Sequence, residues 1–164
     1  MQSPSIVKPE SFDLILFGGT GDLTWRKLMP ALFQAFRHGT LPKGGRIIGV
    51  GREALTHEQY RERISARFHE VDNAKQPRDD EFAQFAQLLF YQRMDLSKPD
   101  DYQDLAKTLN ERNASTVVMY VATAPALFTA VVEQLAAAGL NTPQTRIVLE
   151  KPLGHDLDLS LIHI

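Results

Sequence analysis

A glycine-rich turn follows the first apolar segment and carries the clearest chemistry in the sequence. It reads Gly18-Gly19-Thr20-Gly21-Asp22-Leu23 and opens an amphipathic segment. Glycine is needed where a chain turns sharply and its backbone approaches a ligand, because a Cβ atom would block the approach. Free N–H groups at the following helix start attract a diphosphate. We therefore expect a dinucleotide site. A tight turn without a ligand is the alternative, and a Walker A loop is excluded because no Gly-Lys-Ser/Thr follows.

The second apolar segment ends in an arginine, Gly49-Val50-Gly51-Arg52, and contains no acid. NAD-selective domains place an acid near this point for the ribose 2′-hydroxyl. A guanidinium can instead donate two parallel hydrogen bonds to a 2′-phosphate, to which Thr20 could add a hydroxyl. We therefore expect NADP in preference to NAD. A solvated surface arginine is the alternative. Glu53 could repel the phosphate or accept a hydrogen bond from an unphosphorylated ribose, so use of both coenzymes stays open.

Residues at other strand ends could complete the site, because ligands of such sheets lie outside the carboxyl ends of the strands. Asp95 and Leu96 could meet the adenine or its ribose, although Asp95 could equally cap the next helix. Tyr120 ends the fourth apolar segment and could be a core residue. Lys151, beside a proline, suits an anionic or hydroxylic substrate. Lys27 could approach the same crevice or be a solvated helical lysine.

The elements that must position these residues alternate along the chain. Buried strands with few polar positions, separated by helices, predict an α/β fold with a doubly wound, Rossmann-like parallel sheet of order 3-2-1-4-5. A single domain is expected over residues 12–157, after a disordered lead-in at 1–11 and before an atypical tail at 158–164. The predicted strands are 12–17, 46–50, 90–94, 116–122 and 146–149, and the predicted helices are 23–36, 56–68, 80–89, 97–112 and 125–138.

Composition excludes several classes of protein. The chain has 164 residues, 43% of them apolar and 23% charged, as in an ordinary globular domain. Its net charge of −2 gives no overall attraction to nucleic acid or to an anionic membrane. The absence of cysteine excludes a disulfide framework and a thiolate metal site, and no metal is expected. With no apolar run of ~18 residues and no signal peptide, we expect a cytoplasmic protein.

Four segments together carry a resemblance to a known family. They are FGGTGDLTWRKLMPALF, IIGVGRE, YVATAP and LEKPLG. In their order and spacing the chain resembles the glucose-6-phosphate dehydrogenases, from about residue 12 to residue 157. The resemblance implies oxidation of glucose 6-phosphate to 6-phosphogluconolactone with NADP, the entry to the pentose phosphate pathway, in a full-length enzyme that is a homo-oligomer.

The resemblance also implies roles for individual residues. Arg52 matches the arginine that binds the 2′-phosphate. Lys151 matches the lysine that meets substrate and coenzyme, and Lys27 a second lysine near the substrate, so these two are the candidate catalytic residues. Thr24 and Trp25 depart from the family pattern. The implied coenzyme contacts are Gly18, Gly19, Thr20, Gly21, Asp22, Leu23, Thr24, Trp25, Arg52, Asp95, Leu96, Tyr120 and Lys151.

The general base of the family is absent from this sequence. In the family it is a histidine within an Arg-Ile-Asp-His-Tyr segment of a second domain, and none of the five histidines here has an Asp-His-Tyr context. We therefore expect an amino-terminal fragment that binds NADP but turns over little or no glucose 6-phosphate. A non-enzymatic NADP-binding or sensing domain is the alternative. A short-chain reductase is set aside because no tyrosine is followed by lysine at the fourth position.

Overall fold

Each short apolar segment forms a strand of one sheet. The computed structural model describes residues 11–19, 21, 24–41, 44–69, 79–112, 116–121, 125–150 and 159–163. The strands are β1 (Ser11–Phe17), β2 (Gly44–Gly51), β3 (Leu89–Arg93), β4 (Thr116–Val121), β5 (Thr145–Glu150) and β6 (Leu159–His163). The helical elements are the π turn η1 (Thr24–Leu28), α1 (Met29–Arg37), α2 (His57–His69), α3 (Asp79–Ala86), α4 (Pro99–Arg112), the 3₁₀ turn η3 (Pro125–Leu127) and α5 (Phe128–Ala137).

The sheet has the strand order β3-β2-β1-β4-β5-β6. Strands β1 to β5 are parallel, which confirms the predicted doubly wound sheet of order 3-2-1-4-5. Strand β6 is not among the predicted elements. It runs antiparallel to β5, pairing Arg146 with His163 and Glu150 with Leu159. Part of the segment expected as an atypical tail thus extends the sheet.

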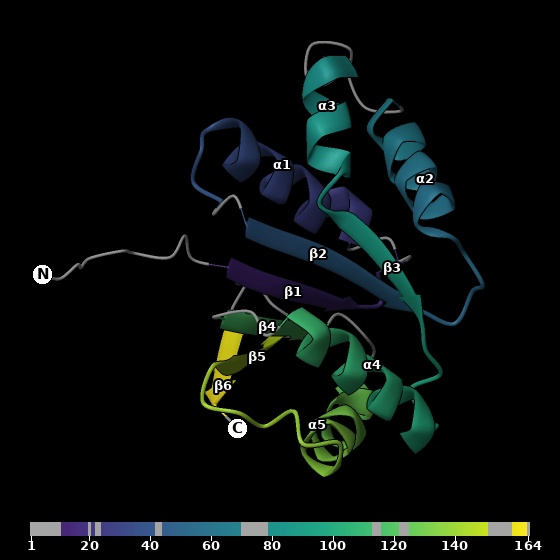
Figure 1. Ribbon diagram of the computed structural model, residues 1–164, viewed down its shortest axis with the longest axis vertical. Coiled ribbons are helices and arrows are strands. Elements are labelled where there is room, and N and C mark those ends of the chain that lie inside the picture. Colours follow the sequence, from purple (N-terminus) through teal and green to yellow (C-terminus); the bar gives the residue numbers. More distant parts are fainter. Residues whose placement is uncertain are drawn as a thin grey trace, which may run out of the picture.

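Helices cover both faces of the sheet. In Figure 1, α1, α2 and α3 lie on one side of the strands, and α4 and α5 lie on the other. Successive side chains of a strand point to opposite faces. Accordingly Ile15 and Phe17 of β1 pack in the cluster with α4 and α5, whereas Leu16 packs in the cluster with α1, α2 and α3. All three side chains are fully buried.

The helix after the glycine turn differs from its prediction. One continuous helix is expected over residues 23–36, but the structure has the π turn η1 and then α1. Pro30 stands in the first turn of α1. Proline lacks an N–H group and its ring clashes with the carbonyl four residues earlier, so the preceding turn cannot continue as regular α-helix. The wider turn carries Arg26 and Lys27 at the surface.

A buried ion pair joins β1 to β2 where Asp13 stands opposite Arg46. The Asp13 side chain is completely buried, and the Arg46 Nε and Nη2 atoms donate to its two oxygens at 2.8 and 2.9 Å. The guanidinium also lies 5.9 Å from the centre of the Phe90 ring. Bidentate geometry satisfies both oxygens of a carboxylate that water does not reach. The pair links β1 and β2 at opposite positions and so supports their register.

Helix α2 begins at a capping box formed by Thr56 and Gln59, and its side chains cover the free edge of β3. The Thr56 hydroxyl accepts from the Gln59 N–H at 3.0 Å, and the Gln59 side chain accepts from the Thr56 N–H at 2.9 Å. From α2, His57 Nδ1 accepts from the Tyr91 N–H at 2.9 Å, and Arg61 Nε donates to the Leu89 carbonyl at 2.7 Å. These side chains take the place of a further strand. In the described part of the chain, no helix has the length and apolar character needed to cross a membrane.

Candidate functional site

The expected ligand crevice lies where the strand order reverses. Neighbouring strands β1 and β4 lead into helices on opposite faces of the sheet, α1 after β1 and α5 after β4 (Figure 1). The backbones that leave the two strands therefore separate at their carboxyl ends, and such a switch point is where doubly wound sheets bind ligands. The glycine turn leaves β1 at this point.

The glycine turn is packed directly on the end of β2. Gly18 has a positive φ of 87°, which glycine adopts at no steric cost. A Cβ atom on Gly19 would lie 2.7 Å from the Gly49 Cα and 2.8 Å from the Val50 nitrogen, both of them backbone atoms. Glycine at position 19 is therefore required by the contact between two chain segments, as well as by any approach of a ligand.

The N–H groups of the described glycines are used within the turn. Those of Gly18 and Gly19 both donate to the Val50 carbonyl, at 3.2 and 3.0 Å, and that of Gly21 donates to the Gly18 carbonyl at 2.9 Å. The close packing on β2 brings one strand-end carbonyl within reach of two amides. These glycines thus shape the turn, and their N–H groups are engaged by backbone carbonyls, while further N–H groups follow at the start of the next helical element. Thr24 and Trp25 begin this element, η1.

A tyrosine of α2 forms a hydrogen bond to the backbone of the glycine turn. The Tyr60 hydroxyl donates to the Gly19 carbonyl at 2.9 Å, and the side chain is completely buried. Burial raises the pKa of the Tyr60 phenol, and electrostatic interaction with Tyr91 raises it further. The centre of the Tyr91 ring lies 5.1 Å from that of Tyr60. The hydroxyl therefore stays a donor. Gly49 makes room for it, since a Cβ atom there would collide with the Tyr60 ring and hydroxyl.

A pocket of about 580 Å³ lies beside the turn, a size usual for ligand sites. It brings together four predicted residues from three strand ends, namely Gly18, Arg52, Asp95 and Leu96. Leu127 adds an apolar wall, and its exposed fraction of 43% is unusual for so large an apolar side chain in the described residues. The complete lining is Gly18, Val50, Gly51, Arg52, Glu53, Met94, Asp95, Leu96, Ser97, Leu127 and Ala130.

Residues Arg52 and Glu53 form an exposed turn whose backbone is fixed by β3. Arg93 Nε donates to the Arg52 carbonyl at 3.0 Å, and the Tyr91 hydroxyl donates to the Glu53 carbonyl at 2.8 Å. The Glu53 carboxylate accepts from Arg63 Nη1 at 2.8 Å. This hydrogen bond lowers the pKa of Glu53, so the side chain is charged at neutral pH. The Arg52 guanidinium and the Glu53 carboxylate thus belong to neighbouring residues on the pocket rim.

The Asp95 carboxylate caps the turn that leads into α4. Its Oδ1 atom accepts from the Ser97 N–H at 2.9 Å and from the Ser97 hydroxyl at 2.6 Å. These hydrogen bonds lower the pKa of Asp95. The Asp95 N–H is itself taken by Asp101, at 2.7 Å, and the Leu96 carbonyl accepts from Tyr102 at 2.9 Å. The capping alternative is therefore realised, while Asp95 and Leu96 also line the pocket.

The remaining predicted residues do not line this pocket or fall outside the described part of the chain. Lys27 is exposed on η1, and Tyr120 is almost completely buried in the cluster under α1, α2 and α3. Neither belongs to the pocket lining. Thr20, Asp22, Leu23 and Lys151 lie outside the described residues.

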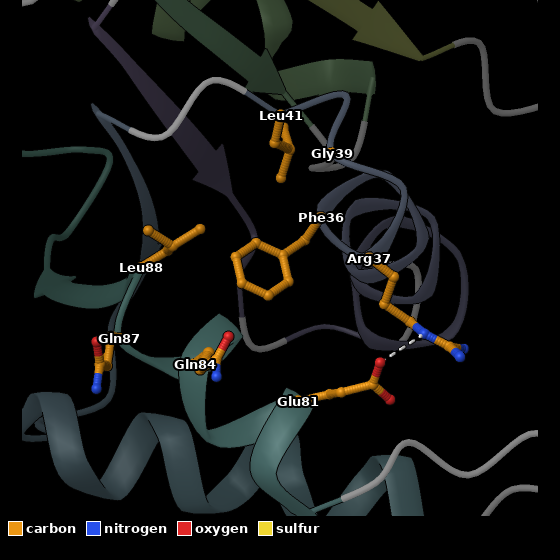
Figure 2. Close-up of a pocket in the computed structure, with 8 residues that line it drawn as sticks. All are labelled: Phe36, Arg37, Gly39, Leu41, Glu81, Gln84, Gln87 and Leu88. Carbon is orange, nitrogen blue, oxygen red and sulfur yellow. Dashed lines mark ion pairs between the residues drawn. The ribbon is translucent and has the colours of Figure 1, made fainter.

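A second pocket, of about 500 Å³, lies away from these residues, between the end of α1, α3 and the start of β3. Figure 2 shows the Phe36 ring at its centre, with Leu88 to its left and Leu41 above it. At one margin Arg37 Nε lies 3.4 Å from Glu81 Oε2. The pocket contains none of the residues predicted to bind coenzyme or substrate.

A protein-family model matches most of the chain. The family model described as "Glucose-6-phosphate dehydrogenase, NAD binding domain" matches residues 15–161. The chain belongs to the glucose-6-phosphate dehydrogenase family. Among curated relatives, the glucose-6-phosphate 1-dehydrogenase of Rhizobium meliloti is 38% identical over 155 residues, which are 94% of this chain and 32% of the relative. That of Mycolicibacterium smegmatis is 38% identical over 160 residues, 95% of this chain and 32% of the relative.

Solved glucose-6-phosphate dehydrogenase structures share the fold. The enzyme of Mycobacterium avium superposes with a TM-score of 0.75 at 30% identity, covering 90% of this chain and 31% of that one. A second structure, a glucose-6-phosphate dehydrogenase in complex with its substrate glucose 6-phosphate, gives a TM-score of 0.74 at 28% identity, with the same two coverages. The chain thus spans about a third of the length of the dehydrogenases it matches.

Several residues of the site in this glucose-6-phosphate dehydrogenase domain are not predicted from sequence. Tyr60, Arg63 and Tyr91 act on the glycine turn and on the Arg52–Glu53 turn from elements distant in the chain. The amphipathic pattern of α2 predicts which of its faces is buried, but not which backbone group a buried hydroxyl meets. Leu127 could have been predicted to line the pocket, since it follows the carboxyl end of β4 at the switch point and pockets are lined mostly by apolar side chains.

Proposed function

We propose that residues 12–157 form the NADP-binding domain of a glucose-6-phosphate dehydrogenase. The observation that carries the coenzyme choice is the position of Arg52, which stands at the end of β2 on the rim of the pocket beside the glycine turn. In the described part of the chain its guanidinium has no salt-bridge partner. It is therefore available for two parallel hydrogen bonds to a 2′-phosphate. NAD is the secondary coenzyme.

The residues around the pocket suit an adenine dinucleotide. Leu127 offers an apolar surface for the adenine, and Asp95 and Leu96 border the place of its ribose. The amides that follow the glycine turn, at the start of η1, would hold the diphosphate. When bound, the coenzyme supplies a nicotinamide ring that accepts a hydride.

The whole dehydrogenase would oxidise glucose 6-phosphate to 6-phosphogluconolactone in the pentose phosphate pathway, as a homo-oligomer. Lys151 and Lys27 would lie on the substrate side. As the hydride leaves the sugar carbon, the hydroxyl proton must pass to a positioned base. This sequence lacks the Asp-His-Tyr segment of the family, so the chain by itself would bind NADP and turn over little glucose 6-phosphate.

The test is calorimetric titration of the wild-type chain and of Arg52→Ala with NADP⁺ and with NAD⁺. We expect Arg52→Ala to weaken NADP⁺ binding at least about tenfold, as for loss of a charge-assisted contact, and to change NAD⁺ binding little. Arg67→Ala, which removes an arginine from α2 away from the pocket, is the control. Equal losses for both coenzymes would remove Arg52 from the phosphate role. Glucose 6-phosphate oxidation by the purified chain would overturn its expected inactivity.

A further inference from the structure

The turn after β2 carries two side chains with opposite coenzyme preferences. Arg52 suits a 2′-phosphate, whereas an acid near this strand end suits the free 2′-hydroxyl of NAD. Glu53 is such an acid, and it lines the same pocket as Arg52. A phosphate that reaches Arg52 would therefore also meet the field of a neighbouring carboxylate. The coenzyme preference of the pocket therefore depends on whether the Glu53 charge is neutralised.

Arg63 holds the carboxylate. Its Nη1 atom donates to Glu53 Oε1 at 2.8 Å, from the second turn of α2 and ten positions further along the chain. The two side chains remain accessible, with exposed fractions of 36% for Arg63 and 52% for Glu53. The hydrogen bond takes up one oxygen that could otherwise accept from a ribose hydroxyl. The positive charge offsets the negative one as seen from the pocket.

The backbone of the turn cannot readily rearrange around this pair. Both carbonyls, of Arg52 and Glu53, accept hydrogen bonds from β3 side chains, at 3.0 and 2.8 Å. The direction in which each side chain leaves the backbone is thus set by the sheet. What remains adjustable is the charge of Glu53 beside Arg52, which Arg63 balances; the other carboxylate of the pocket, Asp95, is held by Ser97 instead.

We propose that Arg63 is a specificity-determining residue that favours the 2′-phosphorylated coenzyme. By binding the Glu53 carboxylate, it offsets the negative charge that would repel the 2′-phosphate, and it occupies an oxygen that could otherwise accept from a ribose 2′-hydroxyl. The inference rests on the proposed NADP binding. Arg63 acts through Glu53 and is a positioning residue, with no contact to the coenzyme required. Without Arg63, Glu53 would repel a 2′-phosphate and accept from a 2′-hydroxyl, so preference would move toward NAD.

The test uses two probes that differ only in the 2′-phosphate, 2′,5′-ADP and 5′-ADP, titrated calorimetrically into the full chain at low salt. We expect Arg63→Gln to weaken 2′,5′-ADP binding about three- to tenfold, the range for accessible charges a few ångströms apart, and to leave 5′-ADP binding unchanged or tighter. Glu53→Gln should tighten 2′,5′-ADP binding. Higher ionic strength should reduce both changes.

The double variant Glu53→Gln/Arg63→Gln separates positioning from direct contact. If Arg63 acts only through Glu53, the double variant binds 2′,5′-ADP as Glu53→Gln does, within about twofold, because there is no carboxylate left to hold. A double variant as weak as Arg63→Gln would show that Arg63 contacts the phosphate itself and would overturn the proposal. So would an equal loss for both probes. Arg67→Gln, one turn further along α2, is the matched charge control and should change neither affinity.

The same titrations separate this inference from the proposed coenzyme. A wild-type chain that binds 2′,5′-ADP no more tightly than 5′-ADP would contradict NADP preference, and the role of Arg63 would fall with it. A wild-type chain that prefers 2′,5′-ADP, with Arg63→Gln keeping the full preference, would contradict only the role of Arg63.

Discussion

The buried Tyr60 hydroxyl donates a 2.9 Å hydrogen bond to the carbonyl oxygen of Gly19 and so connects α2 to the middle of the glycine turn. The turn is also held by the Val50 carbonyl, which accepts from the Gly18 and Gly19 amides just before that carbonyl. These hydrogen bonds hold the backbone of Gly18 and Gly19 in place without a ligand. A preorganised loop avoids the entropy loss of ordering on binding.

Removing this hydroxyl should loosen the turn. Tyr60→Phe leaves a buried carbonyl without its donor, so we expect a loss of about 1–2 kcal/mol in the free energy of unfolding. Dinucleotide affinity should fall severalfold, because the turn must then be ordered on binding. Urea denaturation and calorimetric titration with NADP⁺ measure the two effects. Ile64→Val, a buried change on the same helix that leaves the turn untouched, should cost similar stability with unchanged affinity. Equal affinity losses in both variants would contradict a specific role of the hydroxyl.

Gly19 should tolerate substitution less well than a glycine with positive φ in open space. In Gly19→Ala the new methyl group would meet backbone atoms of β2 at 2.7 and 2.8 Å, so two chain segments must move apart. Gly139 has a φ of 79° and nothing within 4 Å of an added Cβ atom, so Gly139→Ala carries only the backbone strain of about 1–2 kcal/mol. We expect Gly19→Ala to lower the urea midpoint clearly more. The reverse order would show that the turn is loosely packed.

The ion pair between Asp13 and Arg46 should behave as a buried pair. Arg46→Met removes both guanidinium hydrogen bonds from a fully buried carboxylate, which is expected to cost about 3 kcal/mol or more of stability. Asp13→Asn is the other single change, and the double variant Asp13→Asn/Arg46→Met should be more stable than Arg46→Met, because the buried carboxylate charge is gone. Urea denaturation at neutral pH measures both. Simple additivity of the two single changes would show that the pair is not coupled.

The contact between His57 and the Tyr91 N–H predicts a pH dependence of stability. Desolvation against Phe90, and then the charge of Arg61, lower the pKa of His57. The unfolded chain therefore takes up a proton at higher pH than the folded one. This contribution to stability is complete above the unfolded pKa of about 6.5 and is lost as the pH falls toward the lower, folded pKa.

Replacing the imidazole by a non-titrating acceptor should remove this dependence. His57→Asn keeps an oxygen near the position of Nδ1, so the difference in urea midpoint between pH 7.5 and pH 5.5 should be smaller than in the wild type. The variant His38→Asn, at an exposed position after α1, should keep the wild-type difference. An unchanged pH dependence in His57→Asn would assign it to other groups.

The sequence alone was sufficient for the sheet and for part of the site, because these depend on local pattern. Buried parallel strands must be apolar, so strand number and order followed from the alternation of segments. The capping box of Thr56 and Gln59 spans four residues and was readable directly. The place of Arg52 on the pocket rim could be predicted because the end of a strand is a fixed place in this fold.

Only the tertiary structure decided how the site is supported. The contact between Tyr60 and Gly19 joins residues 41 positions apart, and that between Tyr91 and Glu53 joins residues 38 apart. Such pairs depend on how α2 and β3 pack on β2, which no local periodicity encodes. The same packing places the Val50 carbonyl within reach of two glycine amides, a contact that no local pattern predicts. Motif positions are thus a local property, but which donors stay free for a ligand is decided by segments that meet only in the fold.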